Sequence, residues 1–165
     1  MSIHDDVKES LKTQSLRVCV VGIGRIGLPT ALLFAKSGLN TIGVDINESL
    51  VQNINSGIYP LKDEPGIEEI FNDVIKNKKF SATTKIEEAV PNSDLILLSL
   101  PTPMDENNIP DYSALRSVGT KLSEILSSNS LVIVESTIEP GFIEDELITI
   151  IEKSSELKIG ENLFI

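Results

Sequence analysis

The chain has 165 residues, of which 41% are hydrophobic and 24% are charged, a composition typical of a single globular domain and not of a disordered segment. The 25 aspartates and glutamates outnumber the 14 lysines and arginines, and this net charge of −11 argues against binding to nucleic acid or to an anionic membrane surface. One cysteine and one histidine exclude a disulfide framework and the usual zinc sites, so we expect no metal.

The N-terminal segment is polar and acidic, and no apolar run reaches the roughly 20 residues of a membrane helix. The segment therefore does not resemble a signal peptide, and the sequence predicts a cytoplasmic protein. We expect residues 1–15 to form an N-terminal extension, either as frayed chain or as a short surface helix.

Continuously apolar runs follow, and such runs are typical of parallel strands that are covered on both faces. Strands are predicted at residues 16–21, 41–44, 95–100 and 131–134, with weaker candidates at 80–83 and from 162 onward. Apolar residues at steps of three and four predict helices over residues 67–75, 115–126 and 143–151. Asn47 and Ser113 are candidate N-caps. The alternation of strand and helix predicts a doubly wound α/β domain over residues 16–165, with a mostly parallel sheet and helices on both faces.

Gly22, Gly24 and Gly27 form a G-x-G-x-x-G motif between the first predicted strand and a helix expected over residues 28–36. In this context the first glycine permits a tight turn, the second lets the backbone approach a pyrophosphate, and the third lets the helix pack closely on the strand. The N-terminus of the helix then offers unpaired N–H groups and a partial positive charge to the phosphates. Pro29 supports this placement, because proline is tolerated in the first turn of a helix.

Asp45 ends the second predicted strand, 18 residues after Gly27 and near the spacing of the acid that hydrogen-bonds the adenosine ribose in Rossmann domains. A carboxylate there accepts from both ribose hydroxyls and repels a 2′-phosphate, and neither Ile46 nor Asn47 supplies a compensating arginine. The sequence therefore predicts NAD and not NADP as the cofactor. The alternative is a plain glycine-rich turn with Asp45 as a helix cap. Arg25 lies either over the pyrophosphate or adenine, or in solvent at the start of the helix.

Two further loops follow predicted strands and carry a threonine each. Thr102 lies between Pro101 and Pro103, and Thr137 follows Glu135-Ser136. Ligands of doubly wound sheets bind beyond the carboxyl ends of the strands, so both hydroxyls are candidates for contact with the rest of a dinucleotide. The alternative is turn chemistry alone, with Thr137 as a helix cap. Cys19 lies inside the first predicted strand, where we expect a buried, unreactive thiol and not a nucleophile.

Together these motifs resemble, in order and spacing, the UDP-glucose/GDP-mannose dehydrogenase family. The resemblance extends over residues 16–165 and is carried by the stretches 20–31, 43–47, 64–66, 101–103, 135–137 and 140–141. Gly-Leu-Pro-Thr after the glycine loop and Glu-Ser-Thr after the strand at 131–134 are most similar to the UDP-N-acetyl-mannosamine dehydrogenase branch.

The resemblance implies an NAD-dependent, two-step oxidation of the C6 alcohol of a UDP-sugar to the uronate, by an enzyme that forms a homodimer. It places Asp45 on the ribose, Thr102 near the cofactor's ribose, and Thr137 near the nicotinamide and the reacting carbon, where it helps to position a catalytic water. It assigns the dinucleotide loop to residues Gly22, Gly24, Arg25, Ile26 and Gly27. Position 25 is often aromatic in the family, so Arg25 departs from the pattern. Glu64-Pro65-Gly66 matches a stretch that approaches the active site.

The family's nucleophilic cysteine, catalytic lysine and most of its sugar-nucleotide site lie on a middle helix and a second α/β domain. We therefore expect this chain to be the NAD-binding domain, truncated before those parts, and to bind NAD without turnover. Two alternatives remain at this point. One is a nucleotide-sensing regulatory module, which shares the glycine loop and the acid after the second strand. The other is UDP-glucose dehydrogenase or another Rossmann dehydrogenase.

Overall fold

A computed structural model describes residues 3–61 and 65–165, and the side chains of residues 8–61 and 65–165. The core is a six-stranded sheet in which all paired strands are parallel, in the order β3-β2-β1-β4-β5-β6. The strands are β1 (Arg17–Val21), β2 (Asn40–Val44), β3 (Phe80–Thr83), β4 (Leu95–Leu98), β5 (Ser130–Val134) and β6 (Leu163–Phe164). The chain builds the sheet outward from β1 to β3 and then returns to add β4 on the other side of β1. This confirms the predicted doubly wound α/β domain.

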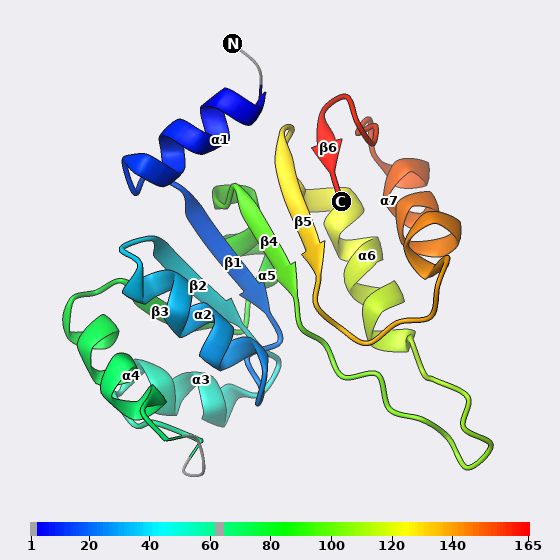
Figure 1. The fold of residues 1–165 in the computed structure, drawn as a ribbon. Helices are drawn as coiled ribbons and strands as arrows, with labels where there is room; N and C mark the ends of the chain where they lie inside the picture. Colours follow the sequence, from blue (N-terminus) through cyan, green and yellow to red (C-terminus); the bar gives the residue numbers. More distant parts are fainter. Residues whose placement is uncertain (1–2, 62–64) are drawn as a thin grey trace.

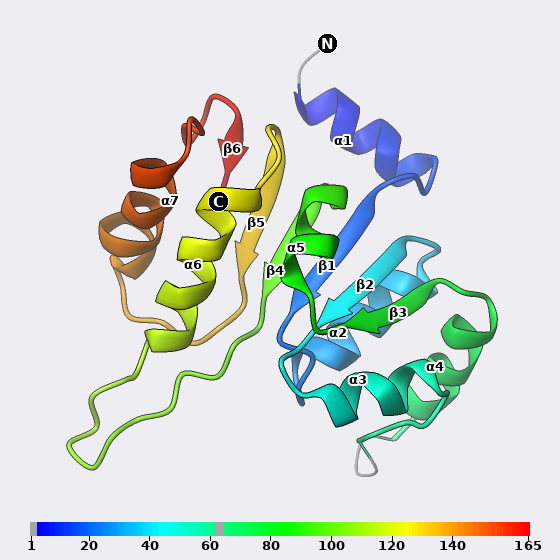
Figure 2. The same cartoon turned by 180° about the vertical axis from the view of Figure 1, so that it is seen from behind.

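Helices cover both faces of this sheet (Figures 1 and 2). They are α1 (Ile3–Lys12), α2 (Gly27–Lys36), α3 (Glu48–Asn55), α4 (Ile67–Lys76), α5 (Ile86–Ala89), α6 (Ser113–Ile125) and α7 (Ile148–Ser154), with a 3₁₀ turn η1 (Val90–Asn92) and a π-helical turn η2 (Ile143–Leu147). The single helix predicted at 143–151 is therefore π-helical in its first part. α1 lies at the opposite end of β1 from the loops that follow β1, β4 and β5 (Figure 1).

The core consists of two hydrophobic clusters, one on each face of the sheet. In β1, Val18 and Val20 belong to the cluster with α2, α3 and α4, whereas Cys19 and Val21 belong to the cluster with α5, α6 and α7. The residues of β4 alternate in the same way between the clusters. Because both faces of these strands are buried, β4 is apolar throughout and β1 is apolar over residues 18–21, which is why they were recognisable as strands.

Two N-caps were predicted, and one of them is wrong. Asn47 caps α3 as expected, since its side-chain oxygen accepts a hydrogen bond from the Leu50 N–H at 3.1 Å. Ser113 is instead the first residue of α6, and no side chain caps that helix at its N-cap position. The N–H of Ser113 donates to the carboxylate of Asp111 at 2.8 Å. An aspartate two residues earlier therefore accepts from the first N–H of the helix, in place of the serine cap that we expected.

The strand predicted at 95–100 ends at Leu98, and the chain then leaves the sheet in a long excursion before α6. This segment extends away from the body of the domain in both views (Figures 1 and 2). Met104 pairs with Pro110 across it, and the Asp105 carboxylate accepts from the N–H groups of Asn107 and Ile109, both at 2.8 Å. The excursion is thus an ordered hairpin-like turn.

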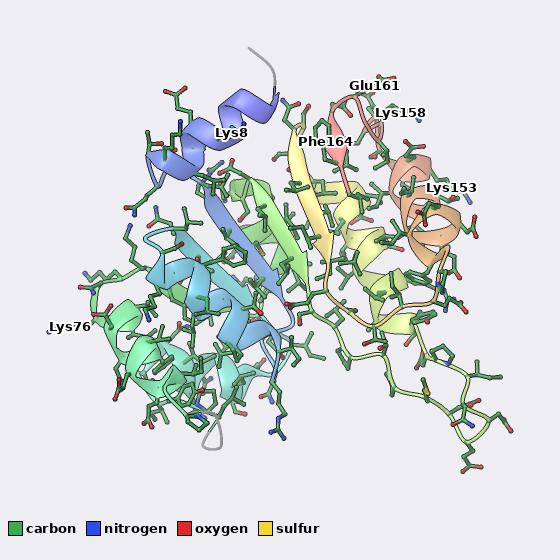
Figure 3. The ribbon with its side chains drawn as sticks, in the orientation of Figure 1. Lys8, Lys76, Lys153, Lys158, Glu161 and Phe164 are labelled. Atoms are coloured by element: carbon green, nitrogen blue, oxygen red, sulfur yellow. The ribbon has the colours of Figure 1, made fainter. Side chains whose placement is uncertain are left out.

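Charged side chains lie on the outside of the domain. Figure 3 shows this for the lysines on α4 and α7 and in the turn before β6, Lys76, Lys153 and Lys158. Among the described residues, no helix combines the length and the apolar composition that crossing a bilayer requires.

Candidate functional site

A cavity of about 800 Å³ opens at the carboxyl ends of the strands, at the point between β1 and β4 where the strand order reverses. Its size falls in the range of roughly 300–1,000 Å³ that is usual for small-molecule sites. The segments after β1, β2, β3, β4 and β5 and one side of α6 line it. Of the residues predicted for the site, the lining contains Gly22, Gly24, Arg25, Ile26, Asp45, Thr102 and Thr137.

A second hollow, of about 300 Å³, lies at the opposite end of the strands. Several of its polar side chains are already engaged within the domain: Arg17 binds the carboxylate of Asp94, and the Lys79 ammonium donates to the carbonyl of Gly38 at 2.8 Å. The larger cavity lies at the edge where doubly wound sheets bind ligands, and it gathers the residues that the sequence singles out. We therefore place the candidate site there.

The three glycines of the loop meet different surroundings. Gly22 has φ +88°, in the left-handed region that favours glycine, and a Cβ there would overlap the carbonyl oxygen of Ser99. A Cβ on Gly27 would overlap the carbonyl oxygen of Gly22 and approach the Ser99 Cβ to 3.0 Å. Around Gly24, in contrast, nothing lies within 4 Å of the Cβ position. The first and third glycines therefore allow close packing, and the second leaves open space on the cavity side.

α2 starts directly behind this loop and directs its N-terminus toward the cavity. The helix begins at Gly27, Pro29 lies in its first turn as predicted, and the preceding Ile26 is 63% exposed. Gly27 itself does not line the cavity but packs beneath it. Helix N-termini carry a partial positive charge, so the open space beside Gly24, just before the start of α2, suits an anionic group such as a pyrophosphate.

The carboxylate of Asp45 faces the glycine loop from the end of β2. One oxygen accepts from the N–H of Ile23 at 3.1 Å, and the other accepts from the N–H of Asn47 at 3.0 Å. Each carboxylate oxygen can accept more than one hydrogen bond, so both keep capacity for a ligand. The alternative in which Asp45 caps a helix is wrong, because Asn47 provides the side-chain cap of α3.

The loops that carry Thr102 and Thr137 are joined to each other and to α2. The Ser136 hydroxyl oxygen accepts from the N–H of Leu100 at 2.9 Å, which ties the loop after β5 to the loop after β4. The Thr30 hydroxyl of α2 donates to the carboxylate of Glu135 at 3.1 Å. The structure thus holds both threonine loops at the mouth of the same cavity.

Sequence reasoning missed the part of the lining that comes from α6 and from the segment after β3. The residues concerned are Thr84, Ile86, Ala114, Ser117, Val118 and Lys121. No spacing or motif in the sequence distinguishes these residues. Those on α6 lie on or beside an apolar stripe, which is typical of a helix face that packs on the core. Glu135 and Ser136 also line the cavity, and here a signal was present, since both belong to the quoted Glu-Ser-Thr motif.

The Glu64-Pro65-Gly66 stretch does not join this cavity as far as the structure describes it. Glu64 lies outside the described residues, and Pro65 and Gly66 are not among the lining residues; Gly66 stands at the N-cap of α4.

Cys19 is fully buried in β1, and this burial raises the pKa of its thiol to about 12, as expected for an unreactive core cysteine. Among the side chains of residues 8–61 and 65–165, no three His, Cys, Asp or Glu groups cluster as a metal site would require.

Relatives of known activity resemble the chain over most of its length. A UDP-N-acetyl-D-mannosamine dehydrogenase of Pyrococcus horikoshii is 33% identical over 150 residues, which cover 91% of this chain and 35% of that protein. The enzyme of the same name from Campylobacter jejuni is 36% identical over 142 residues, covering 86% and 34%. The chain therefore spans about a third of the length of the curated relatives that it matches.

Solved structures of nucleotide-sugar dehydrogenases are also similar to the chain. The ternary complex of GDP-mannose dehydrogenase from Pseudomonas aeruginosa superimposes with a TM-score of 0.85 at 28% identity, covering 90% of this chain and 35% of that one. The sequence profile of the UDP-glucose/GDP-mannose dehydrogenase family, NAD binding domain, matches residues 16–164. The glycine loop, the acid after β2 and the two threonine loops all lie within this match, so the chain belongs to the UDP-glucose/GDP-mannose dehydrogenase family and contains its NAD-binding domain.

Proposed function

We propose that the chain is the NAD-binding part of a nucleotide-sugar 6-dehydrogenase that oxidises the C6 alcohol of a UDP-sugar to the uronate. UDP-N-acetyl-mannosamine is the sugar nucleotide that we favour, because two of the relatives described above carry that substrate in their names. Oxidation of an alcohol to a carboxylate removes four electrons, so each sugar requires two NAD. In this proposal residues 1–15 form an extension and residues 16–165 the NAD-binding domain, and the whole protein is a cytoplasmic homodimer.

The observation that carries the proposal is the convergence of the glycine loop, Asp45 and both threonine loops on one cavity. In our assignment the backbone of Gly22, Gly24 and Gly27 and the N-terminus of α2 receive the pyrophosphate, with Arg25 and Ile26 at the mouth. Asp45 accepts hydrogen bonds from the adenosine ribose. We assign the pyrophosphate to Gly24 because the space beside it is open, and the ribose to Asp45 because two backbone N–H groups fix the orientation of its carboxylate.

The two threonines belong to the other end of the cofactor in this assignment. Thr102 lies at the ribose next to the nicotinamide, and Thr137 lies where the reacting carbon of the sugar meets the cofactor. NAD supplies the hydride acceptor when it is bound. The Thr137 hydroxyl can hold a water by donating to it or accepting from it, and a water must supply the second oxygen of the carboxylate product.

The proposal is tested by cofactor binding to the chain itself. We expect NAD to raise the melting temperature and to bind by calorimetry, with NADP far weaker on both measures, because the Asp45 carboxylate repels a 2′-phosphate. Asp45→Asn removes the charge but keeps the shape of the side chain. It should weaken NAD by about tenfold, as expected for a lost charged hydrogen bond, and should narrow the difference between NAD and NADP.

Glu69→Ala serves as a matched control, because it removes one negative charge from an exposed position on α4 that does not line the cavity. It should leave both affinities unchanged. Equal binding of NAD and NADP by the unmodified chain, or an Asp45→Asn variant that binds NAD with undiminished affinity, would show that the ribose assignment is wrong.

A further inference from the structure

The loop after β5 is anchored on both sides of Thr137. Before Thr137, the hydroxyl oxygen of Ser136 accepts from the N–H of Leu100 at 2.9 Å. After it, the N–H of Glu139 donates to the hydroxyl oxygen of Tyr112 at 3.0 Å. The two anchors come from opposite ends of the excursion between β4 and α6. The position of Thr137 therefore depends on contacts made outside its own loop.

Tyr112 is itself held firmly. It is only 4% exposed, and its ring packs against Phe142 with 4.5 Å between centroids. The guanidinium of Arg116 lies 5.9 Å from the centroids of both rings, and two hydrogen bonds of 2.6 and 3.0 Å fix it to the carboxylate of Glu146. A buried ring in such packing presents its hydroxyl at one place. It is a rigid support for the loop and not a mobile partner.

We propose that Tyr112 is a positioning residue for the nicotinamide end of the site, an inference that rests on the proposed function. Tyr112 does not line the cavity and cannot touch the cofactor there. It acts by fixing the backbone at Glu139, two residues after Thr137, so that the threonine hydroxyl is held in place before the ligand arrives. Binding then requires less ordering of the loop, which is the advantage of a preorganised site.

The adenosine end of the site is independent of this support. Our assignment gives it to the glycine loop and to Asp45, which follow β1 and β2, while Tyr112 supports a loop that follows β5. Loss of the Tyr112 hydroxyl should therefore weaken ligands that carry a nicotinamide and spare those that do not. A general loss of folding would weaken both kinds.

The test is Tyr112→Phe, which removes one hydroxyl and keeps the ring that packs on Phe142. Calorimetry with NAD and with ADP-ribose, which lacks the nicotinamide, should show NAD weakened by about fivefold and ADP-ribose unchanged, the magnitude expected for one partly buried hydrogen bond. Hydrogen exchange at the Glu139 amide should be faster in the variant. The matched control is Tyr59→Phe, because Tyr59 is the chain's other tyrosine and also packs on a phenylalanine, Phe71, with 5.3 Å between centroids, in the opposite cluster. It should leave both affinities unchanged.

Ser136→Ala removes the other anchor and should lower the ratio of NAD to ADP-ribose affinity in the same direction. If Tyr112→Phe leaves NAD affinity at the level of the unmodified chain, or lowers both affinities equally, Tyr112 has no positioning role. These outcomes differ from failure of the proposed function, in which the unmodified chain would bind neither NAD nor ADP-ribose.

Discussion

Gly24 and Gly27 lie one turn apart, and adding a methyl group to each should have opposite consequences. At Gly27, the added Cβ would overlap the carbonyl oxygen of Gly22 and stand 3.0 Å from the Ser99 Cβ. Neither obstacle is the flexible end of a side chain, so the glycine loop or α2 must move. Overpacking of this kind costs about 3 kcal/mol, and each kcal/mol lowers the melting temperature of a domain of this size by roughly 2–4 °C. Gly27→Ala should therefore melt roughly 6–12 °C below the unmodified chain.

At Gly24 the same substitution meets no obstacle. Nothing lies within 4 Å of the Cβ position, and Gly24 is not among the residues with positive φ. An alanine that fits the native backbone gains about 0.4–1 kcal/mol, because it restricts the unfolded chain. Gly24→Ala should melt at the same temperature as the unmodified chain or slightly above it. Its methyl group, however, projects into the space that we assign to the pyrophosphate, so NAD affinity should fall at least tenfold.

Thermal denaturation and calorimetry with NAD on the two variants separate these effects, and each variant is the control for the other. Gly24→Ala should retain stability and lose binding, whereas Gly27→Ala should lose stability first. If Gly24→Ala binds NAD like the unmodified chain, the pyrophosphate does not approach this backbone and the placement of the cofactor is refuted. If Gly27→Ala melts at the original temperature, the close packing of α2 on the loop is refuted.

Three further outcomes are expected. The Asp94 carboxylate accepts hydrogen bonds from the guanidinium and the backbone N–H of Arg17, and these contacts hold the pKa of Asp94 below its usual value. Asp94→Asn should therefore lower the free energy of unfolding in urea by about 0.5–1 kcal/mol at neutral pH. This difference in stability should vanish in acid, where the carboxylate of the unmodified chain is protonated. Cys19, with a thiol pKa of about 12, should react with a thiol reagent only as fast as the domain unfolds, and rapid modification of native protein would contradict its burial. Because that cysteine is the only one present, we expect no NADH from NAD and UDP-N-acetyl-mannosamine, and measurable turnover would contradict the need for a separate nucleophile.

The strands and the glycine loop were predictable because their signals are local. Residues 18–21 of β1 and all residues of β4 are apolar since both faces are buried, and the G-x-G-x-x-G motif is informative because it lies between a strand and a helix. The end of β4 was not predictable. The strand does not continue to residue 100 because the N–H of Leu100 donates to the Ser136 hydroxyl and not to a neighbouring strand. Ser136 is 36 residues away, and no local pattern in the sequence indicates this contact.

The same reason explains the residues missed at the site. Ser117 and Lys121 line the cavity only because α6 packs with one edge beside the carboxyl ends of the strands. Tyr112 resembles any core aromatic in the sequence, and its contact with Glu139 depends on the path of two loops. The Ser113 cap was mispredicted since Asp111 and Ser113 are both good acceptors for a helix start, and spacing alone does not choose between them.

The alternation of β1 between the two clusters has a consequence for the order in which the domain can assemble. Val18 and Val20 are covered by helices that are synthesised within the next sixty residues, whereas the opposite side of the strand, with Cys19 and Val21, waits for α6 and α7. One edge of β1 is also incomplete at first, because β4, which pairs with it, is anchored by the contact of Arg17 with Asp94, 77 positions later. A nascent chain that has emerged only as far as β3 therefore carries an unpaired strand edge and an uncovered apolar surface, and it is at this stage of synthesis that the protein is most exposed to aggregation.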